Sequence, residues 1–143
     1  MAKATAERAA QEAWELLTEL MMGQRGRMLA IASEFELAPA QVMALNALEP
    51  GRPRPMSELA TAMRCDNSNV TGIVDRLEAR GLVERRPGER DRRVKMLEVT
   101  EEGEELRRRL HERLSRPPEP LASLSDEDAR ALRDILARAL GRD

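Results

Sequence analysis

The sequence predicts a mainly α-helical fold that carries one small β wing, and three observations lead to this prediction. Apolar residues recur at helical spacing along most of the 143 residues. Two proline-rich segments, 49–55 and 115–122, separate these helical runs. Between Gly81 and Thr100, a Gly-containing turn instead joins two short strand-like runs. Because two short helices come directly before this hairpin, the core is predicted to be a winged helix-turn-helix.

One long helix is expected from about Ala6 to Glu34, although Gly23 and Gly26 weaken its middle. Its apolar positions are Trp14, Leu17, Leu20, Met21, Met28 and Ile31. The next helix should begin at Pro39, since proline is tolerated in a first helical turn, and should continue to about residue 48.

The two short helices are joined by a tight turn. Ser57 is the expected cap of the first, residues 58–64. Asp66 is the expected cap of the second, residues 67–80, which should stop at Gly81. This spacing is the helix-turn-helix pattern.

Two more helices are predicted in the C-terminal third. Thr100 should cap residues 101–114, and Ser125 with Asp128 resembles a capping box that opens the last helix. The last helix carries an apolar stripe of Leu132, Ile135, Leu136 and Leu140. The first helix, at about 1.5 Å per residue, would be longer than one side of so small a domain, so its end must pack on something, and this stripe from the same or a second chain is the candidate.

The helix over residues 67–80 has two chemically different faces. At about 100° per residue, one face is apolar; it comprises Val70, Ile73, Val74 and Leu77. The opposite face is small and polar, which suits a helix that enters the major groove and reads base edges with side chains near its N-terminus. The candidates are Asn67, Ser68, Asn69 and Thr71, with Gly72 on the same small face and Arg76 placed for a phosphate. The alternative is an ordinary amphipathic helix whose Asn and Ser residues only cap and solvate it.

Positive charge is concentrated on the predicted hairpin, although the chain has a formal net charge of −2. From Glu84 to Lys95 there are six positive and three negative side chains. The positive ones are Arg85, Arg86, Arg90, Arg92, Arg93 and Lys95. Arginine on a loop tip suits the narrow minor groove, so Arg90, Arg92 and Arg93 are the candidate DNA contacts. Asp91 is expected to orient an arginine such as Arg93 through an ion pair. A merely solvated hairpin is the alternative, which the preceding helix-turn-helix disfavours.

Other functions have little support in the sequence. Aromatic residues are nearly absent, which argues against stacking on single strands and favours duplex nucleic acid. Cys65 and His111 are the single cysteine and histidine, too few for a zinc site, and no phosphate-cradling loop or nucleophile constellation is present. We therefore expect no enzyme, cofactor or metal. Cys65 is expected to be a small buried residue.

Neither a membrane-spanning run nor a signal peptide is indicated, so a cytoplasmic protein is expected. Arginine outnumbers lysine 22 to 2, and we attribute most of this excess to codon usage, because solvated faces accept either residue.

The segment SELATAMRCDNSNVTGIVDRLEARGLVERRPGERDRRVKMLEVTEEG, residues 57–103, resembles the winged-helix core of the MarR family of bacterial transcriptional regulators. The most specific element is Asp91 with Arg93 two residues later, followed by Val99-Thr100 where the family has Leu-Thr. The flanking helices are similar in order and length, so the resemblance covers nearly the whole chain.

The resemblance implies a homodimer that binds pseudo-palindromic duplex DNA as a repressor, or less often as an activator. It implies an N-terminal dimerisation helix over 1–34, a DNA-binding domain over 35–100 and C-terminal dimerisation helices over 101–143. Small phenolic or amphipathic ligands release many relatives from DNA. Some relatives sense oxidants through a cysteine in the first helix, but Cys65 lies outside it.

By the same resemblance, Asn67, Ser68, Asn69 and Gly72 lie where the family reads bases, and Arg92 and Arg93 lie where its wing enters the minor groove. Many relatives have arginine at position 72, so the base contact that it makes is missing here. A winged helix used only for protein interaction is the competing function; it would predict an apolar wing rather than an arginine-rich one.

Overall fold

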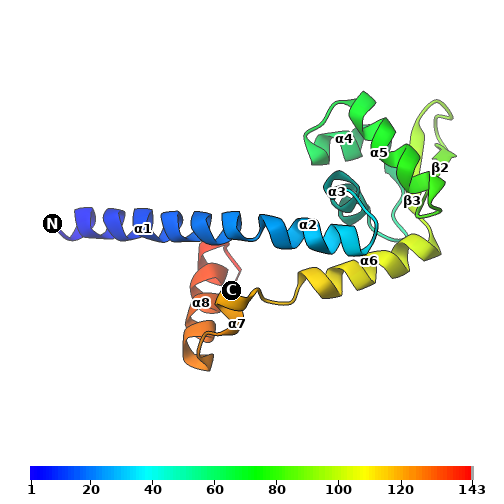
Figure 1. Ribbon diagram of the computed structural model, residues 1–143. Helices are drawn as coiled ribbons and strands as arrows, with labels where there is room; N and C mark the ends of the chain where they lie inside the picture. Colours follow the sequence, from blue (N-terminus) through cyan, green and yellow to red (C-terminus); the bar gives the residue numbers. More distant parts are fainter. Residues whose placement is uncertain (143) are drawn as a thin grey trace.

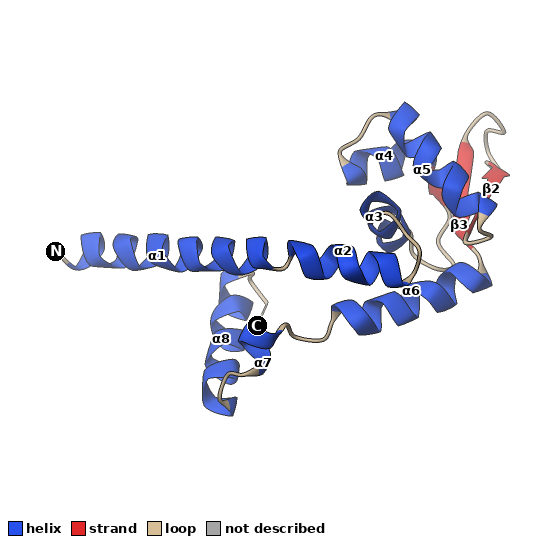
Figure 2. Ribbon diagram, viewed as in Figure 1, coloured by secondary structure: helices blue, strands red, loops and turns tan. Residues whose placement is uncertain are grey.

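The computed structural model describes residues 1–142, which form eight helices and one three-stranded antiparallel sheet. A compact lobe holds the sheet and the helices near it, and a helical arm that ends at the N-terminus extends away from this lobe (Figure 1). Figure 2 shows the strands gathered at the end of the molecule far from the N-terminus. The predicted fold class is confirmed.

The arm consists of two helices rather than the single long helix predicted. Helix α1 spans Ala2–Gly23 and helix α2 spans Arg25–Glu34. The break falls at Gln24, between the two glycines that weaken this part of the helix. Gln24 keeps right-handed backbone angles (φ −89°, ψ −3°), so α2 continues close to the direction of α1 (Figure 1).

Helix α3 spans Pro39–Ala47 and begins at the predicted proline. Gln41, in its first turn, accepts a hydrogen bond from the Ala38 backbone N–H at 2.9 Å through Oε1. The side chain of the third helical residue thus satisfies a backbone donor at this helix start.

The predicted helix-turn-helix is present, with one correction. Helix α4 spans Met56–Met63 and helix α5 spans Asn67–Ala79. Ser57 does not cap α4, because the helix already begins at Met56, directly after the extended backbone of Pro55. Between the helices, Arg64 adopts a left-handed conformation (φ 52°).

Strands β2 (Val83–Pro87) and β3 (Lys95–Val99) form the predicted wing hairpin, in which Val83 pairs with Val99. A third strand, β1 (Arg54–Pro55), was not predicted; it pairs with the other side of β3. Two residues that include a proline give no strand pattern in a sequence. Proline is nonetheless compatible with an edge strand, where its missing N–H breaks no ladder.

The C-terminal helices are α6 (Glu101–Leu114), α7 (Glu119–Ala122) and α8 (Asp126–Ala139). The predicted caps are confirmed: the hydroxyls of Thr100 and Ser125 each accept a backbone N–H at 3.1 Å. The single turn of α7 lies inside the segment predicted only to interrupt the helices.

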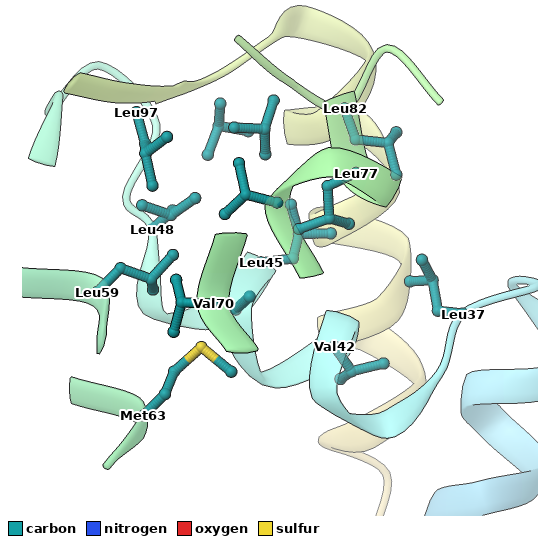
Figure 3. Close-up of a cluster of buried hydrophobic side chains, with 14 of the residues drawn as sticks. Leu37, Val42, Leu45, Leu48, Leu59, Met63, Val70, Leu77, Leu82 and Leu97 are labelled. Atoms are coloured by element: carbon teal, nitrogen blue, oxygen red, sulfur yellow. The ribbon is translucent and has the colours of Figure 1, made fainter. Parts of the chain in front are cut away.

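The buried residues of the hydrophobic core come from positions 31 to 110 of the sequence. In this core α3, α4, α5 and α6 pack together and against the sheet (Figure 3). Its fully buried large side chains are Leu45, Leu48, Leu59, Leu77, Leu97, Leu110, Val70, Val74 and Val83. The predicted apolar face of α5 is therefore a core face, with Ile73 only partly buried.

Outside this core the helices expose apolar side chains. Among the residues whose exposure the structure describes, α1, α7 and α8 contain none that is buried. Their large exposed side chains include Trp14 (63% exposed), Leu16, Met21, Met22 and Ile135, and Leu140 directly after α8 is exposed as well.

Within residues 1–142, no single helix has the length and apolar character to cross a membrane. Only the arm together with α3, bent by 80° between them, meets that test, and α3 belongs to the core described above.

Candidate nucleic-acid interface

The N-terminus of α5 is built by the predicted cap. Asp66 Oδ1 accepts the Asn69 backbone N–H at 3.0 Å and the Ser68 hydroxyl at 2.9 Å. The hydrogen bond from Asn69, and then that from Ser68, lower the pKa of the Asp66 carboxyl. The carboxylate is therefore charged at neutral pH and fixes the first turn of the helix.

The polar side chains of this turn are exposed, as predicted. Thr71 donates its hydroxyl to the Asn67 carbonyl at 2.8 Å, which leaves its oxygen as an acceptor. Across residues 1–142, the structure gives the Asn67 and Asn69 side-chain amides no hydrogen-bond partner. Each amide therefore offers a donor and an acceptor to a molecule outside the chain.

Gly72 and Arg76 lie further along the exposed side of α5. A Cβ added at Gly72 would meet no atom within 4 Å. Packing within the chain therefore does not require glycine here, although glycine inside a helix costs about 0.8–1 kcal/mol relative to alanine. The glycine instead leaves the helix backbone open to close approach from outside.

The wing tip is a tight turn between Pro87 and Lys95. Gly88 N–H donates to the Val94 carbonyl at 2.9 Å, and Val94 N–H donates to the Asp91 carbonyl at 3.1 Å. A Cβ at Gly88 would lie 2.6 Å from the Asp91 oxygen, so the turn requires glycine at this position.

The prediction that Asp91 pairs with the Arg93 side chain is wrong. Asp91 Oδ1 instead accepts the backbone N–H of Arg93 at 3.0 Å. An aspartate bonded to the amide two residues later stabilises a local turn, and among the described residues Asp91 forms no ion pair. Asp91 shapes the tip while the guanidinium of Arg93 stays available.

The arginines of the wing fall into two groups. In the described part of the chain, the exposed side chains of Arg90, Arg92 and Arg93 make no ion pair or hydrogen bond. Arg86, further down the hairpin, is bound by Glu84 at 3.0 Å and Glu98 at 3.2 Å. The positive charge that remains for a partner is therefore concentrated at the tip.

Arg85 has a role that the sequence did not indicate: it joins the wing to α5. Its guanidinium pairs with Asp75 and with Glu78 (2.9 Å), and its Nη2 donates to the Thr71 carbonyl at 3.3 Å. The side chain is only 20% exposed. Burial lowers the pKa of Arg85, but the hydrogen bonds and charges of Asp75 and Glu78 outweigh burial and raise it. The strand pattern gave no signal for this, because the partners lie on another element.

This network also removes negative charge from the exposed side of α5. Asp75 and Glu78 are the carboxylates of that helix, and both are paired with Arg85. This surface combines amides without partners, an exposed helix backbone at Gly72 and a cationic wing tip. Such a surface is suited to the grooves and phosphates of a duplex.

The single cysteine and the single histidine lie outside α5 and the wing: Cys65 is in the turn before α5, and His111 is on α6. Cys65 is half-buried against the core, where its Sγ donates to the Met63 carbonyl at 3.3 Å. His111 lies exposed on α6. Among the residues that the structure describes, no group of three or more His, Cys, Asp or Glu side chains is arranged to hold a metal ion.

Comparison with known proteins gives a consistent result. A model of the MarR family matches residues 37–95, from just before α3 to the start of β3. An uncharacterised HTH-type transcriptional regulator of Bacillus subtilis, YfiV, is 33% identical over 114 residues, which are 75% of this chain and 69% of the relative. The chain spans about half the length of most of the curated relatives that it matches, from 48% to 69% of each.

Solved structures share the fold over nearly the whole chain. The YusO protein from Bacillus subtilis is 27% identical, with a TM-score of 0.76 over 96% of this chain and 99% of that one. The transcriptional repressor CouR, in a structure with a 23-mer DNA duplex, is 28% identical, with a TM-score of 0.67 over 87% of this chain and 89% of that one. The family is one of transcriptional regulators and not of enzymes. On its sequence and its fold, the chain described above belongs to the MarR family.

Proposed function

We propose that the chain is a sequence-specific, double-stranded DNA-binding transcriptional regulator that acts as a cytoplasmic homodimer. The proposal rests on one observation. Within residues 1–142, α5 exposes side-chain amides that have no hydrogen-bond partner, and the wing tip exposes arginines that have no ion-pair partner. Helix α5 enters the major groove with Asn67, Ser68, Asn69, Thr71 and Gly72 at the bases and Arg76 at a phosphate. Arg90, Arg92 and Arg93 lie in or beside the minor groove, and Asp91 orients the tip.

The partner in the dimer is a second copy of this chain. Helix α1 exposes Trp14 and Met21, and Ile135 on α8 is exposed together with Leu140, the residue that follows this helix. Helices in proteins draw most of their stability from a packed apolar face. An exchange of these helices between two copies buries that surface. Residues 1–34 and 101–143 then serve dimerisation, residues 35–100 bind DNA, and two half-sites lie about one helical turn apart.

Repression is the proposed sense of regulation, supported by the DNA-bound repressor CouR among the structural neighbours. A small amphipathic or phenolic ligand that releases the DNA is a further part of the proposal. An apolar hollow of about 300 Å³ lies where α1 and α2 meet the start of α3. It is lined by Met21, Gln24, Arg25, Met28, Leu29 and Pro39.

A gel-shift titration tests the proposed function. The purified protein is titrated against the intergenic DNA upstream of its own gene and against an unrelated duplex of equal length, at several salt concentrations. We expect tight, salt-sensitive binding that prefers the upstream fragment. Absence of binding to both duplexes at low salt would favour a protein-interaction module instead.

The amides of α5 should discriminate between sequences. We expect Asn67→Ala or Asn69→Ala to weaken binding to the preferred duplex by about 1–3 kcal/mol, because each amide is lost from a base edge. Binding to random duplex should change less. Titration of both duplexes with each variant measures the difference, and equal losses on both would assign these amides to the DNA backbone.

Gly72→Ala should separate stability from binding. Because the added methyl group meets no atom of the chain, the helix should become more stable by about 0.5–1 kcal/mol. Affinity for the preferred duplex should fall, since the methyl group then stands between the helix and the bases. Urea denaturation and DNA titration of the same sample provide both values. Unchanged or tighter DNA binding would show that Gly72 does not approach the duplex.

A further inference from the structure

The C-terminal end of α2 is bound by an arginine of the helix-turn-helix. Arg80, the residue that closes α5, donates through Nη1 to the Glu36 carbonyl at 2.8 Å and through Nη2 to the Phe35 carbonyl at 3.1 Å. Both carbonyls lie directly beyond the end of α2, where the chain leaves the helix, and a cation close to a helix C-terminus interacts favourably with the helix dipole. One rigid guanidinium therefore ties the end of α5 to the end of the arm.

Helix α6 also contacts the C-terminal end of α2. Arg113 forms a two-point ion pair with Glu34, at 2.9 and 2.6 Å, and the Arg109 guanidinium lies 5.4 Å from the centre of the Phe35 ring. The hydrogen bond with Arg113 lowers the pKa of Glu34. We name residues 34–36 the α2 corner; α5 and α6 both fasten to it through arginines.

The α2 corner is where the two parts of the molecule meet. Helix α2 continues the direction of α1 and with it forms the arm (Figure 1). Helix α5 carries the exposed amides of Asn67 and Asn69. Glu36 is held at a positive φ of 55°, a conformation that non-glycine residues seldom adopt. The backbone of the corner thus has a specific shape in which both carbonyls reach Arg80.

We infer that Arg80 is a positioning residue that fixes the angle of α5 to the arm, and thereby the half-site spacing that a dimer accepts. This inference rests on the proposed function. In a two-fold dimer the arms set the separation of the two α5 helices, and each base pair between half-sites shifts one of them by about 3.4 Å and rotates it about the duplex axis. If the contact between Arg80 and the α2 corner is lost, α5 can follow such a shift.

Lysine is not expected to replace Arg80. A single ammonium group is a compact point charge on a flexible stem, whereas the guanidinium reaches two carbonyls with a rigid fork. Such two-point contacts are a structural reason, in addition to codon usage, for part of the excess of arginine over lysine. Arg107 makes a similar contact, with the Leu45 and Asn46 carbonyls at the end of α3.

The test compares duplexes of different spacing. A preferred duplex is first selected from a random library with the wild-type protein, and two further duplexes carry one base pair more or one fewer at its centre. Wild type should prefer the selected spacing by about tenfold or more. Arg80→Ala and Arg80→Lys should bring that preference closer to one, by a factor of about 2 to 10. Arg108→Ala is the charge-matched control, because within residues 1–142 the partners of Arg108 are Glu105 and Glu112 of its own helix.

The ratio between spacings distinguishes positioning from stability. A variant that merely folds less well loses the same fraction of active protein on every duplex, so its ratio stays that of wild type. An unchanged ratio for Arg80→Ala overturns the inference. A fall of about one unit in its salt dependence also overturns it, since Arg80 would then be a phosphate contact. If wild type selects no sequence, the proposed function fails, and the inference fails with it.

Discussion

Gly103→Ala is expected to destabilise the protein by about 3 kcal/mol or more, because the added methyl group has no space. Gly103 is buried in the first turn of α6. A Cβ there would overlap the Leu82 carbonyl oxygen and lie 2.9 Å from Val99 Cγ1. The Leu82 oxygen already accepts the Thr100 backbone N–H at 3.1 Å, so it is held by the junction of the hairpin with α6. Neither backbone segment moves without disturbing the other.

Urea denaturation followed by circular dichroism measures this loss, which is a large part of the 5–15 kcal/mol that typically stabilises a folded protein. Gly72→Ala is the matched control, since the same substitution in a helix with open space should stabilise. An unfolding midpoint of Gly103→Ala equal to that of wild type would contradict the close packing of α6 on the hairpin.

The double variant Arg92→Ala with Arg93→Ala should lose affinity for every duplex, because two wing-tip cations no longer meet phosphates. Each lost phosphate contact removes about 0.9 from the slope of log affinity against log salt, so the slope should fall by about two. At about 0.15 M salt this corresponds to a loss of roughly 30-fold. Titrations at several salt concentrations measure both quantities.

Arg86→Ala serves as the control on the same hairpin. Its guanidinium is already paired with Glu84 and Glu98, so its removal should leave the salt slope nearly unchanged. A double variant with the slope of wild type would exclude the wing tip from DNA binding, and an equal effect of Arg86→Ala would show that binding senses only overall charge.

Elements with local signals could be predicted from the sequence. Helix α5 combines a capping aspartate, an apolar stripe at helical spacing and a glycine at its end, all within one segment. Thr100 and Ser125 carry similar information for α6 and α8. The exposed amides and the cationic tip could also be predicted, because they belong to segments with local signals and lie on faces that do not pack into the core.

The parts that the sequence did not predict depend on partners far along the chain. Strand β1 exists because β3 offers a free edge, and two residues carry no periodicity of their own. Arg85 and Arg93 look alike in a basic run, but Asp75 and Glu78 lie within reach of Arg85 alone. Gly23 and Gly26 indicated a weak point in the first helix, and the structure has the break there, at Gln24. The glycines alone did not show whether the helix would be interrupted or would continue through this point.

Selection of duplexes from a random library, followed by sequencing, tests the central claim most directly. If two copies of the chain each place an α5 in a major groove, the enriched sequences should form an inverted repeat with half-sites about 10 base pairs apart. Asn67→Ala or Asn69→Ala should relax the preference within each half-site. Recovery of sequences no different from the starting library, or of one unrepeated site, would contradict a sequence-specific homodimer.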